Sequence, residues 1–518
     1  MIATIPSATL TGVHGIAVSV EVHVSNGIPG FTVVGLPDAA CRESRDRVRA
    51  ALLSTGLDWP IKRVTVNLAP SGVRKGGPGL DLPIAVGLLV ASGRLDPAKV
   101  AGHAFIGELG LDGSIRSVPG VVAMVDAIGS SSVVLPVGCV REGQLVARAA
   151  VQGARTLGEL LAALNGSPSL RRFGAYTEPA EAACVDQVRL SWSIEETHLD
   201  LADVRGQPVG RHAVEVAAAG GHHLLFIGPP GSGKTMLAKR LPGLLPPLER
   251  DDALEVSRIW SAAGLPVPGG GLPYWPPFRS PHHGASVVSL VGGGTAAMRP
   301  GEVSLAHAGV LFLDEMGEFP AQALDSLRQP LEEGVVTVCR ARAVAVFPAR
   351  FILVGATNPC PCGERTAPGS CACSETARSR YARRLSGPLL DRFDLAVNLA
   401  RPDINYLLGG ASGEPSESVA KRVSMARQRA AVRGVRCNAE IPSHMLDALV
   451  PVVPAARKEL ALRMRSGELS ARGVDRIRRV ARTVGDLAGR DDALEECDIL
   501  EALELRSARN SFLPERAL

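Results

Sequence analysis

Residues 228–235 read Gly-Pro-Pro-Gly-Ser-Gly-Lys-Thr and fill every fixed position of the phosphate-binding pattern G-x-x-x-x-G-K-[ST]. In such a loop, backbone N–H groups surround phosphate oxygens, and the N-terminus of the following helix adds positive potential. The ammonium group of Lys234 would reach the β- and γ-phosphates, and the hydroxyl of Thr235 would ligate Mg²⁺. The sequence therefore predicts a nucleoside triphosphate site, formed by Gly228, Pro229, Pro230, Gly231, Ser232, Gly233, Lys234 and Thr235.

Two further apolar runs end in polar side chains that could act on a bound triphosphate. Residues 310–315 end in two carboxylates, and hydrolysis needs one carboxylate for the metal ion and another to activate water. We expect Asp314 to hold Mg²⁺ through its water shell and Glu315 to polarise the attacking water. Residues 351–358 end in Asn358, whose amide could orient that water, although an ordinary turn would also explain an asparagine at the end of a strand.

Arg392 lies in the short segment 387–394, Gly-Pro-Leu-Leu-Asp-Arg-Phe-Asp. A planar cation delivered to a γ-phosphate accelerates hydrolysis by about 10³–10⁵-fold. A surface ion pair with Asp391 or Asp394 would contribute only about 0–1 kcal/mol. The spacing alone leaves both roles open.

The elements around the phosphate loop have the order that the motif requires. Residues 224–227 form a short apolar run typical of a buried strand, and residues 236–240 are typical of the first turns of a helix. Composition and periodicity divide the chain into four parts: alternating short strands and glycine-rich turns over 1–165, a linker at 166–198, an α/β core at 199–400 and a helical region at 401–518.

The order of these motifs resembles that of the AAA+ ATPases. Within that group it resembles the magnesium-chelatase-like YifB/ComM family, which are helicase-like ATPases associated with natural transformation in bacteria. Further strings similar to that family occur at residues 202–207, 277–283, 300–307 and 470–473. The resemblance implies an α/β fold class with an N-terminal Lon-protease-like (ribosomal protein S5 domain 2-like) α+β domain, an AAA+ P-loop α/β core and a helical C-terminal lid of the magnesium-chelatase type.

The same resemblance implies roles for two arginines. Arg392 would be the arginine finger that acts on the ATP of a neighbouring subunit, and Arg472 would be the second sensor, reaching back to the γ-phosphate from the lid. Residues 203–207 would form the wall of the adenine pocket. The family likeness also implies ATP and Mg²⁺ as cofactors and a homo-oligomeric ring, expected to be a hexamer.

The N-terminal region carries strings similar to the protease domain of Lon, at residues 75–80 and 107–113. That family uses a serine and a lysine. Aligned residue by residue, the serine position falls on Gly79 and the lysine position on Val122, and neither side chain can act as nucleophile or base. We therefore expect the domain to keep the fold without the peptidase chemistry and to serve assembly or partner docking.

Four cysteines form the pattern C-x-C, eight residues, C-x-C directly after Asn358. Four thiolates this close in sequence can complete a tetrahedral Zn²⁺ site, although structural zinc sites usually have the wider C-x₂₋₄-C spacing. The alternative is a loop of four reduced thiols. The expected structural zinc ligands are Cys360, Cys362, Cys371 and Cys373.

Two insertions are candidates for contact with DNA. Lys234 and Asp314 are too far apart for a single crossover, which indicates an insertion at residues 260–298. Residues 331–346 have the pattern of a β-hairpin with Arg340 and Arg342 at its turn, and corresponding hairpins line a central pore in helicase-like relatives. These arginines would contact phosphates without reading sequence, or they could be a solvated loop tip. His282 and His283 could bind DNA or cap the insertion.

Composition sets weaker limits. The chain has 518 residues and a formal net charge of +4, and this charge alone does not indicate a nucleic-acid-binding protein. Aromatic residues are only 4% of the total, which disfavours the stacking of nucleic-acid bases on aromatic side chains. No run of about 18 apolar residues and no signal-peptide pattern are found, so we expect no membrane span. Ten cysteines in so long a chain indicate reduced thiols in the cytoplasm.

The leading functional hypothesis is an ATP-hydrolysing ring motor that moves along or remodels DNA, as a helicase or branch-migration factor in recombination or natural transformation. The alternative is a chelatase-type ATPase that remodels another protein and has no DNA activity. An ATP-dependent protease is disfavoured by Gly79 and Val122.

Overall fold

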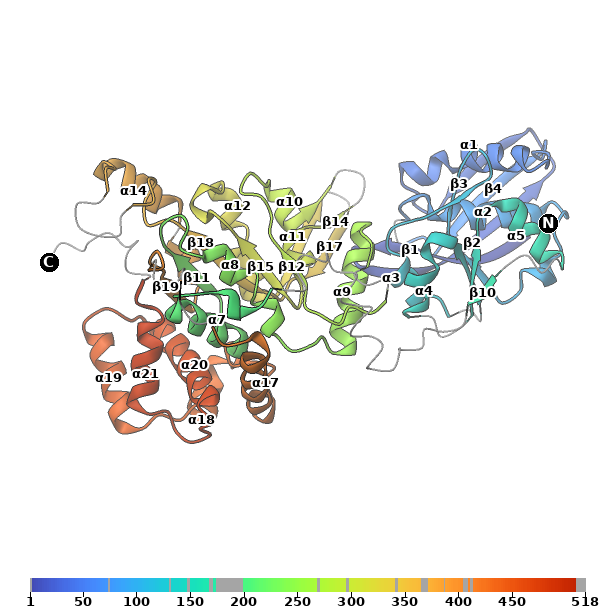
Figure 1. Ribbon diagram of the computed structural model, residues 1–518. Coiled ribbons are helices and arrows are strands. Elements are labelled where there is room, and N and C mark those ends of the chain that lie inside the picture. Colours follow the sequence, from blue (N-terminus) through green and yellow to red (C-terminus); the bar gives the residue numbers. More distant parts are fainter. Residues whose placement is uncertain are drawn as a thin grey trace.

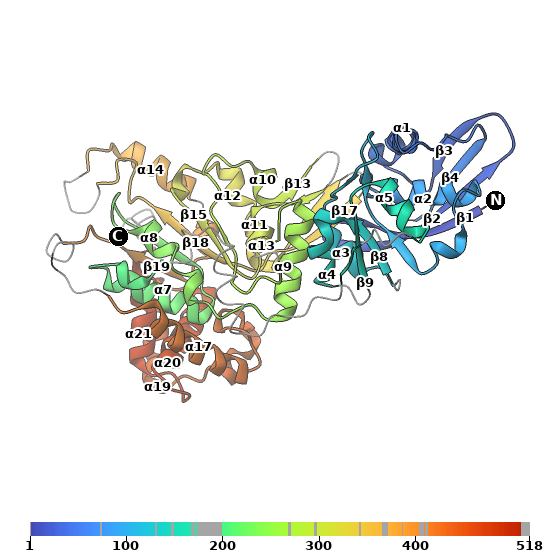
Figure 2. The ribbon, with the colours of Figure 1, turned by 45° about the vertical axis from the view of Figure 1, so that its right-hand side comes forward.

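In the computed structural model the N-terminal domain lies on one side of an α/β core, and a helical C-terminal region packs beneath the core (Figure 1). In Figure 2, helix α9 (Arg250–Ala263) lies between the rest of the core and the N-terminal domain. The structure describes residues 2–72, 75–129, 132–146, 150–166, 171–173, 199–267, 271–294, 298–340, 343–364, 371–385, 387–403, 409 and 413–508.

The N-terminal domain contains two four-stranded sheets and a buried helix. Strands with alternating buried and exposed residues form the first sheet, in the order β1-β2-β4-β3, and the second has the order β10-β9-β8-β5. The first sheet comprises β1 (Ile2–Thr11), β2 (His14–Ser25), β3 (Gly30–Val34) and β4 (Arg63–Ala69); the second comprises β5 (His103–Phe105), β8 (Ser132–Pro136), β9 (Ala150–Ala154) and β10 (Arg171–Phe173), and β6 (Glu108–Leu109) pairs with β7 (Ile115–Arg116). Strand β10 lies within the predicted linker, 166–198, whose residues 167–170 and 174–198 lie outside the described part of the chain.

Helix α2 (Asp81–Ala91) is buried along its entire length because nearly all of its residues are apolar. Its single carboxylate, Asp81, accepts hydrogen bonds from the Arg47 guanidinium at 2.6 and 3.0 Å. The other helices of this domain are α1 (Ala39–Ser54), α3 (Val121–Asp126), α4 (Val140–Gln144) and α5 (Leu157–Leu164).

The core is built on a five-stranded parallel sheet of order β12-β15-β18-β11-β19. Its central strands are apolar throughout because both faces are covered. Along β11 the side chains of Leu224 and Phe226 pack toward the C-terminal helices, whereas those of Leu225 and Ile227 pack toward α9 and the hairpin β16–β17. The strands are β11 (Leu224–Ile227), β12 (Phe278–Arg279), β15 (Val310–Leu313), β18 (Ile352–Thr357) and β19 (Leu395–Asn398).

Two antiparallel ribbons project from the core within the predicted insertions. They are β13 (Gly292–Gly293) with β14 (Arg299–Pro300), and β16 (Val335–Arg340) with β17 (Ala343–Pro348). The second ribbon confirms the predicted β-hairpin. The core helices are α7 (Pro208–Gly220), α8 (Lys234–Ala238), α9 (Arg250–Ala263), α10 (Val287–Val291), α11 (Glu302–Leu305), α12 (Ala321–Asp325), α13 (Arg328–Glu333), α14 (Glu375–Arg384) and α15 (Gly387–Leu390).

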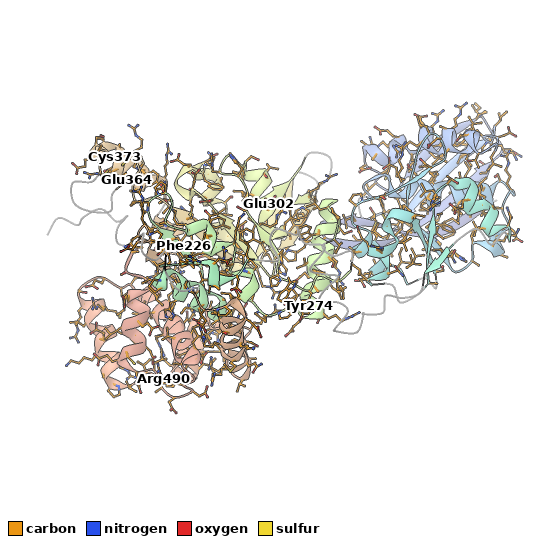
Figure 3. All side chains as sticks on the ribbon, viewed as in Figure 1. Phe226, Tyr274, Glu302, Glu364, Cys373 and Arg490 are labelled. Atoms are coloured by element: carbon orange, nitrogen blue, oxygen red, sulfur yellow. The ribbon has the colours of Figure 1, made fainter. Side chains whose placement is uncertain are left out.

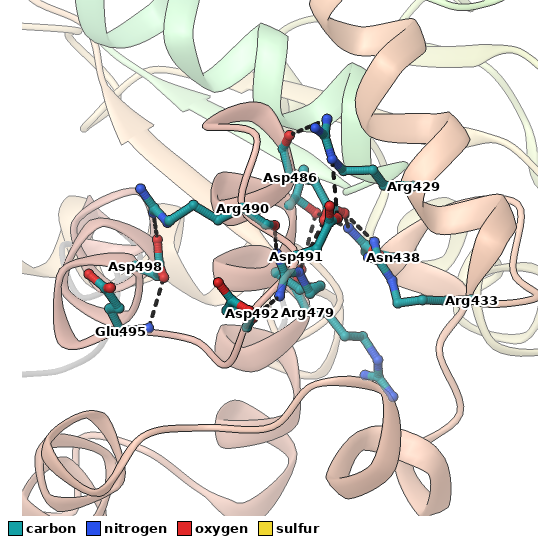
Figure 4. A network of polar contacts seen from close by, with 12 residues as sticks. Arg429, Arg433, Asn438, Arg479, Asp486, Arg490, Asp491, Asp492, Glu495 and Asp498 are labelled. Carbon is teal, nitrogen blue, oxygen red and sulfur yellow. Dashed lines mark hydrogen bonds and ion pairs between the residues drawn. The ribbon is translucent and has the colours of Figure 1, made fainter.

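The C-terminal region is helical, and α20 is its central element. One face of α20 buries Ile477, Val480 and Ala481 against α7 and α17. Asp486 on the same helix is buried and is neutralised by Arg433 and Arg482, while Asn438 donates to it at 2.8 Å (Figure 4). The helices are α17 (Ser416–Val432), α18 (Leu446–Leu449), α19 (Pro454–Arg465), α20 (Ala471–Leu487) and α21 (Glu496–Glu504). The predicted α/β fold class with a helical C-terminal region is thus confirmed, and the structure adds that the core sheet is parallel.

The N-terminal domain docks on α9 through α3 and α4. The N–H of Gly120 donates to the Ser261 carbonyl at 2.8 Å, and the Ser261 hydroxyl donates to Glu142 at 2.6 Å. Val122, the position where the Lon resemblance would put a lysine, is buried with Val267 of the core. A residue position that would carry catalysis in a peptidase therefore contributes apolar packing between two domains here.

Candidate nucleotide-binding site

The phosphate loop follows β11 directly and is shaped by close backbone packing. A side chain at Gly228 would lie 2.4 Å from the Leu399 carbonyl oxygen, so only glycine fits there. Gly233 has a φ of +87° and caps the first turn of α8, which begins at Lys234. The strand, turn and helix predicted from the sequence are therefore present in that order.

Lys234 lies buried at the centre of the loop. Its ammonium donates to the carbonyl oxygens of Gly228 at 2.7 Å and Pro229 at 2.9 Å, and to Oδ1 of Asn358 at 3.3 Å. Burial lowers the pKa of Lys234, and the charges of Asp314 and Glu315 oppose that shift. Its three hydrogen-bond acceptors are neutral oxygens, so an anionic phosphate oxygen would be a stronger partner.

The predicted magnesium ligands meet at the same edge of the sheet. Thr235 follows β11 and Asp314 follows β15, and the Thr235 hydroxyl donates to Asp314 Oδ2 at 2.8 Å. The N–H of Glu315 donates to Asp314 Oδ1 at 2.9 Å, which places the second carboxylate beside the first. Hydroxyl and carboxylate oxygens are the ligands that Mg²⁺ prefers, so this donor set fits the ion.

Asn358 completes the carboxyl edge, since it follows β18, the strand between β11 and β15. Two further residues border the loop, Gln207 and Arg401, and of these only Arg401 was not singled out from the sequence. Gln207 donates to the carbonyl oxygens of Ser232 at 3.0 Å and Ala400 at 2.6 Å, so the segment expected to wall the adenine pocket borders the loop. Arg401 bonds to Glu364 at 2.6 Å and to the Pro230 carbonyl at 3.4 Å.

Arg392 lies at the opposite edge of the sheet. Arg392 precedes β19. Two residues later, the N–H of Asp394 donates at 3.0 Å to the carbonyl of His223, which is the residue just before β11. The strands are parallel and four residues long, about 13 Å. Arg392 therefore faces away from the phosphate loop of its own chain. Its guanidinium pairs with Glu332 of α13.

Arg472 belongs to the surroundings of Arg392. Burial lowers the pKa of Arg392, and the positive charges of Arg476, Arg472 and Arg328 lower it further. Arg476 is fixed by Asp394 at 3.2 Å. The sequence resemblance implied that Arg472 reaches back to the γ-phosphate from the lid. In the structure its charge acts on Arg392, and Arg476, one helical turn later, pairs with Asp394 at the amino edge of the sheet.

The four cysteines converge next to the phosphate loop. The sulfur atoms of Cys360, Cys362 and Cys371 lie 3.3–3.6 Å apart, and all four sulfur atoms lie within 4.8 Å of one another. Tetrahedral zinc with Zn–S bonds of about 2.3 Å separates its sulfur ligands by about 3.8 Å, so the donor set and spacing fit zinc. The backbone N–H of Glu364 and the neighbouring thiols lower the pKa of Cys362 to about 6.

In Figure 3, Cys373 and the nearby Glu364 lie at the end of the molecule opposite the N-terminal domain. Phe226 of β11 lies inside the core. A side chain at Gly363 would lie 2.7 Å from the Pro230 ring. The cluster therefore packs against the phosphate loop. Of the two arginines predicted to contact DNA, Arg340 is the last residue of β16, and Arg342 lies outside the described residues.

Parallel sheet, phosphate loop and adjacent carboxylates together define a P-loop nucleotide-binding protein. Three models of the magnesium chelatase family match the chain: "Magnesium chelatase, subunit ChlI" at residues 200–406, "Subunit ChlI of Mg-chelatase" at 20–138 and "Magnesium chelatase, subunit ChlI C-terminal" at 413–506. The chain belongs to the magnesium-chelatase-like AAA+ family, as its motifs predicted.

Full-length relatives support the same assignment. The chain is 45% identical to an uncharacterized protein of Mycobacterium tuberculosis over 93% of this chain and 94% of the relative. It is 40% identical to the competence protein ComM of Haemophilus influenzae, over 98% and 97%, and 40% identical to YifB of Escherichia coli, over 96% and 95%. A shorter match, 27% identical over 35% of this chain, is to a probable DNA helicase MCM9 of Arabidopsis thaliana. Among the described residues, no helix is long and apolar enough to cross a membrane.

Proposed function

We propose that this protein is an ATPase whose active sites are shared between neighbouring subunits of a ring, and that the ring has six subunits. The observation that carries the proposal is the division of the polar residues between two edges of one sheet. Lys234, Thr235, Asp314 and Glu315 meet at the carboxyl edge. Arg392 precedes β19 at the amino edge, and Arg472 lies one helical turn before Arg476, which pairs with Asp394 there. A ring in which the amino edge of one subunit faces the carboxyl edge of the next unites the two sets.

In this site each residue has a separate task. Lys234 neutralises the β- and γ-phosphates. Thr235 and Asp314 would hold Mg²⁺, which would supply further charge neutralisation. Glu315 takes the proton of the attacking water, and Asn358 orients that water. Arg392 of the next subunit stabilises the charge that develops on the γ-phosphate.

We further propose that the motor acts on DNA, as a helicase or branch-migration factor in the cytoplasm. Two findings support this: near full-length similarity to a competence protein and partial similarity to a probable DNA helicase. The hairpin β16–β17 would offer Arg340 and Arg342 to phosphates, with weak sequence preference and an affinity that falls as salt rises. The nine cysteines in the described part of the chain are free thiols, which fits a reducing compartment.

ATP turnover with single-stranded, duplex and branched DNA tests the proposal. Wild-type turnover should rise with at least one DNA form. Lys234→Ala should bind nucleotide weakly, whereas Glu315→Gln should bind normally and lose about 10²–10⁴-fold in turnover, since only water activation is removed. Arg340→Ala with Arg342→Ala should keep basal turnover and lose the DNA response.

A second candidate is ATP-driven remodelling of a partner protein, which the match of all three chelatase models favours. Turnover that no DNA form changes would select this candidate. The cysteine cluster is proposed to hold one structural Zn²⁺ per chain in either case.

A further inference from the structure

Helix α14 begins directly after Cys373 and brings the chain that leaves the sheet at Asn358 back to the same edge. The hydroxyl of Ser374 caps the helix by accepting from the Ala377 N–H at 3.3 Å. Near the other end of α14, Tyr381 is only 6% exposed and belongs to the apolar cluster on the α9 side of the core sheet. A buried tyrosine needs a partner for its hydroxyl, and the partners of this hydroxyl lie in the nucleotide site.

The hydroxyl of Tyr381 lies where β18 ends. It shares a hydrogen bond of 2.9 Å with the hydroxyl of Thr357, the last residue of β18. The Thr357 hydroxyl also lies 3.4 Å from the Asn358 carbonyl oxygen, and the Thr357 carbonyl accepts from the Gly228 N–H at 3.1 Å. The tyrosine therefore bonds to the residue that connects the first residue of the phosphate loop to Asn358.

The Tyr381 hydroxyl also acts on the backbone of Asn358. Burial raises the pKa of Tyr381, and hydrogen bonds with the Thr357 side chain and the Asn358 backbone oppose that rise. A phenol whose ordinary pKa is about 10 stays protonated at neutral pH, so it can donate one hydrogen bond and accept another. Both sides of the peptide that joins Thr357 to Asn358 are thus held by one group.

The same tyrosine packs against the turn that follows Glu315. A side chain at Gly317 would lie 2.5 Å from the Tyr381 hydroxyl oxygen and 2.6 Å from its Cζ, so only glycine allows this approach. Arg384, three residues further along α14, donates to the Gly317 carbonyl at 3.4 Å and pairs with Glu318 at 2.9 Å. One helix thus contacts the chain beyond β15 and β18, the two strands whose ends carry the residues proposed to handle the attacking water.

The side chain of Asn358 depends on this support. Among the described residues it forms one hydrogen bond, which it accepts from Lys234 at 3.3 Å. Because Lys234 is also expected to bind phosphate, that bond does not fix the amide once a nucleotide is present. The direction of the amide is then set by the backbone that the Tyr381 hydroxyl holds.

We propose that Tyr381 is a positioning residue that keeps Asn358 in the direction needed to orient the attacking water. Its hydroxyl fixes the end of β18, and its ring fixes the turn at Gly317 beside it. The inference rests on the proposed function, because that function gives Asn358 the task of orienting water.

The test is ATP turnover by Tyr381→Phe and Thr357→Val, each of which removes one hydroxyl of the pair and keeps the packing. In each, kcat should fall about fivefold with an unchanged KM for ATP, since the loss of about one hydrogen bond lets Asn358 leave its aligned direction. The two changes together should be no slower than either alone, because both remove the same bond. Tyr274→Phe is the matched control and should keep the wild-type kcat, since Tyr274 is partly exposed and lies far from Cys373 in Figure 3.

Combination with Asn358→Ala separates positioning from a general loss of structure. Tyr381→Phe with Asn358→Ala should match Asn358→Ala alone, because a hydroxyl that acts through Asn358 then has nothing left to position. A Tyr381→Phe variant as fast as the wild type would overturn the proposal, as would a combined loss that multiplies the two single losses. A kcat of Asn358→Ala equal to that of the wild type would instead refute the task that the proposed function gives Asn358, and this inference with it.

Discussion

The two edges of the core sheet are built in different ways. At the carboxyl edge, Thr235 bonds to Asp314 and Lys234 bonds to Asn358 within one chain. At the amino edge, the like charges of Arg472 and Arg476 act on Arg392, which pairs with the carboxylate of Glu332 among the described residues. Like charges held together destabilise a lone chain, which is expected where the arginines serve a phosphate on a neighbouring subunit. The difference indicates that one edge holds a subunit's own nucleotide and the other acts on its neighbour's.

The largest effect on turnover is expected when Arg392 at the amino edge is replaced. Arg392→Ala should bind ATP with wild-type affinity, because the residue lies away from its own phosphate loop, but should lose about 10³-fold or more in turnover. Nucleotide binding and turnover are measured on the same preparation. Arg478→Ala is the control: this lid arginine pairs with Asp447 at 2.7 Å, so its loss should leave turnover nearly unchanged. Weakened ATP binding in Arg392→Ala would mean that the finger serves its own site.

The cysteine cluster tests whether a bound metal stabilises the carboxyl edge beside the phosphate loop. Protein purified without chelator should contain about one Zn²⁺ per chain, and Cys371→Ser should lose the metal and lower the midpoint of thermal unfolding. Nucleotide affinity should persist, because the phosphate loop keeps its own hydrogen bonds. Cys497→Ser removes an exposed thiol of α21 and should change neither quantity. Metal-free protein with an unchanged midpoint would return the four residues to ordinary thiols.

A smaller effect, on stability, is expected at the amino edge. Burial lowers the pKa of His223 to about 4, against the opposing charge of Asp394, and its neutral Nδ1 accepts from the Leu353 N–H at 3.0 Å. Between about pH 6.5 and 4, the unfolded chain binds a proton at this residue that the folded chain does not, so stability falls as pH falls. The loss from pH 7.5 to pH 5 should be about 2 kcal/mol.

Denaturant unfolding at several pH values measures this loss. His223→Asn keeps an acceptor for Leu353 and removes the titration, so its stability should fall less between pH 7.5 and 5. His444→Asn, which changes an exposed histidine of the C-terminal region, is the control. An identical fall in wild type and His223→Asn would assign the acid sensitivity to other groups.

The sequence predicted contiguous features well because their geometry is local. The phosphate loop, the carboxylates after an apolar strand and the hairpin β16–β17 each follow from neighbouring residues. Contacts between distant segments were not predictable in this way. The sequence placed Gln207 in the expected adenine-pocket wall, but its hydrogen bond to the Ser232 carbonyl depends on how the two segments fold together.

Arg472 shows a different limit of prediction from sequence. A motif identifies a lid arginine, but only the strand direction and the packing of α20 reveal which edge of the sheet it joins. Val122 is similar, since the sequence excludes a catalytic lysine but does not reveal that the valine packs against Val267. In both cases the residue type was informative, and its partner required the tertiary structure.

The central claim is that one active site needs two subunits, and mixing two inactive variants tests it most directly. Arg392→Ala keeps an intact phosphate loop, and Lys234→Ala keeps an intact finger. In rings formed from equal amounts, about one quarter of the interfaces pair an intact loop with an intact finger. We predict that each variant alone is nearly inactive and that the mixture recovers a part of wild-type turnover, up to about that fraction. Mixed rings that recover no turnover at any ratio, or a wild type fully active as a monomer, would contradict the account.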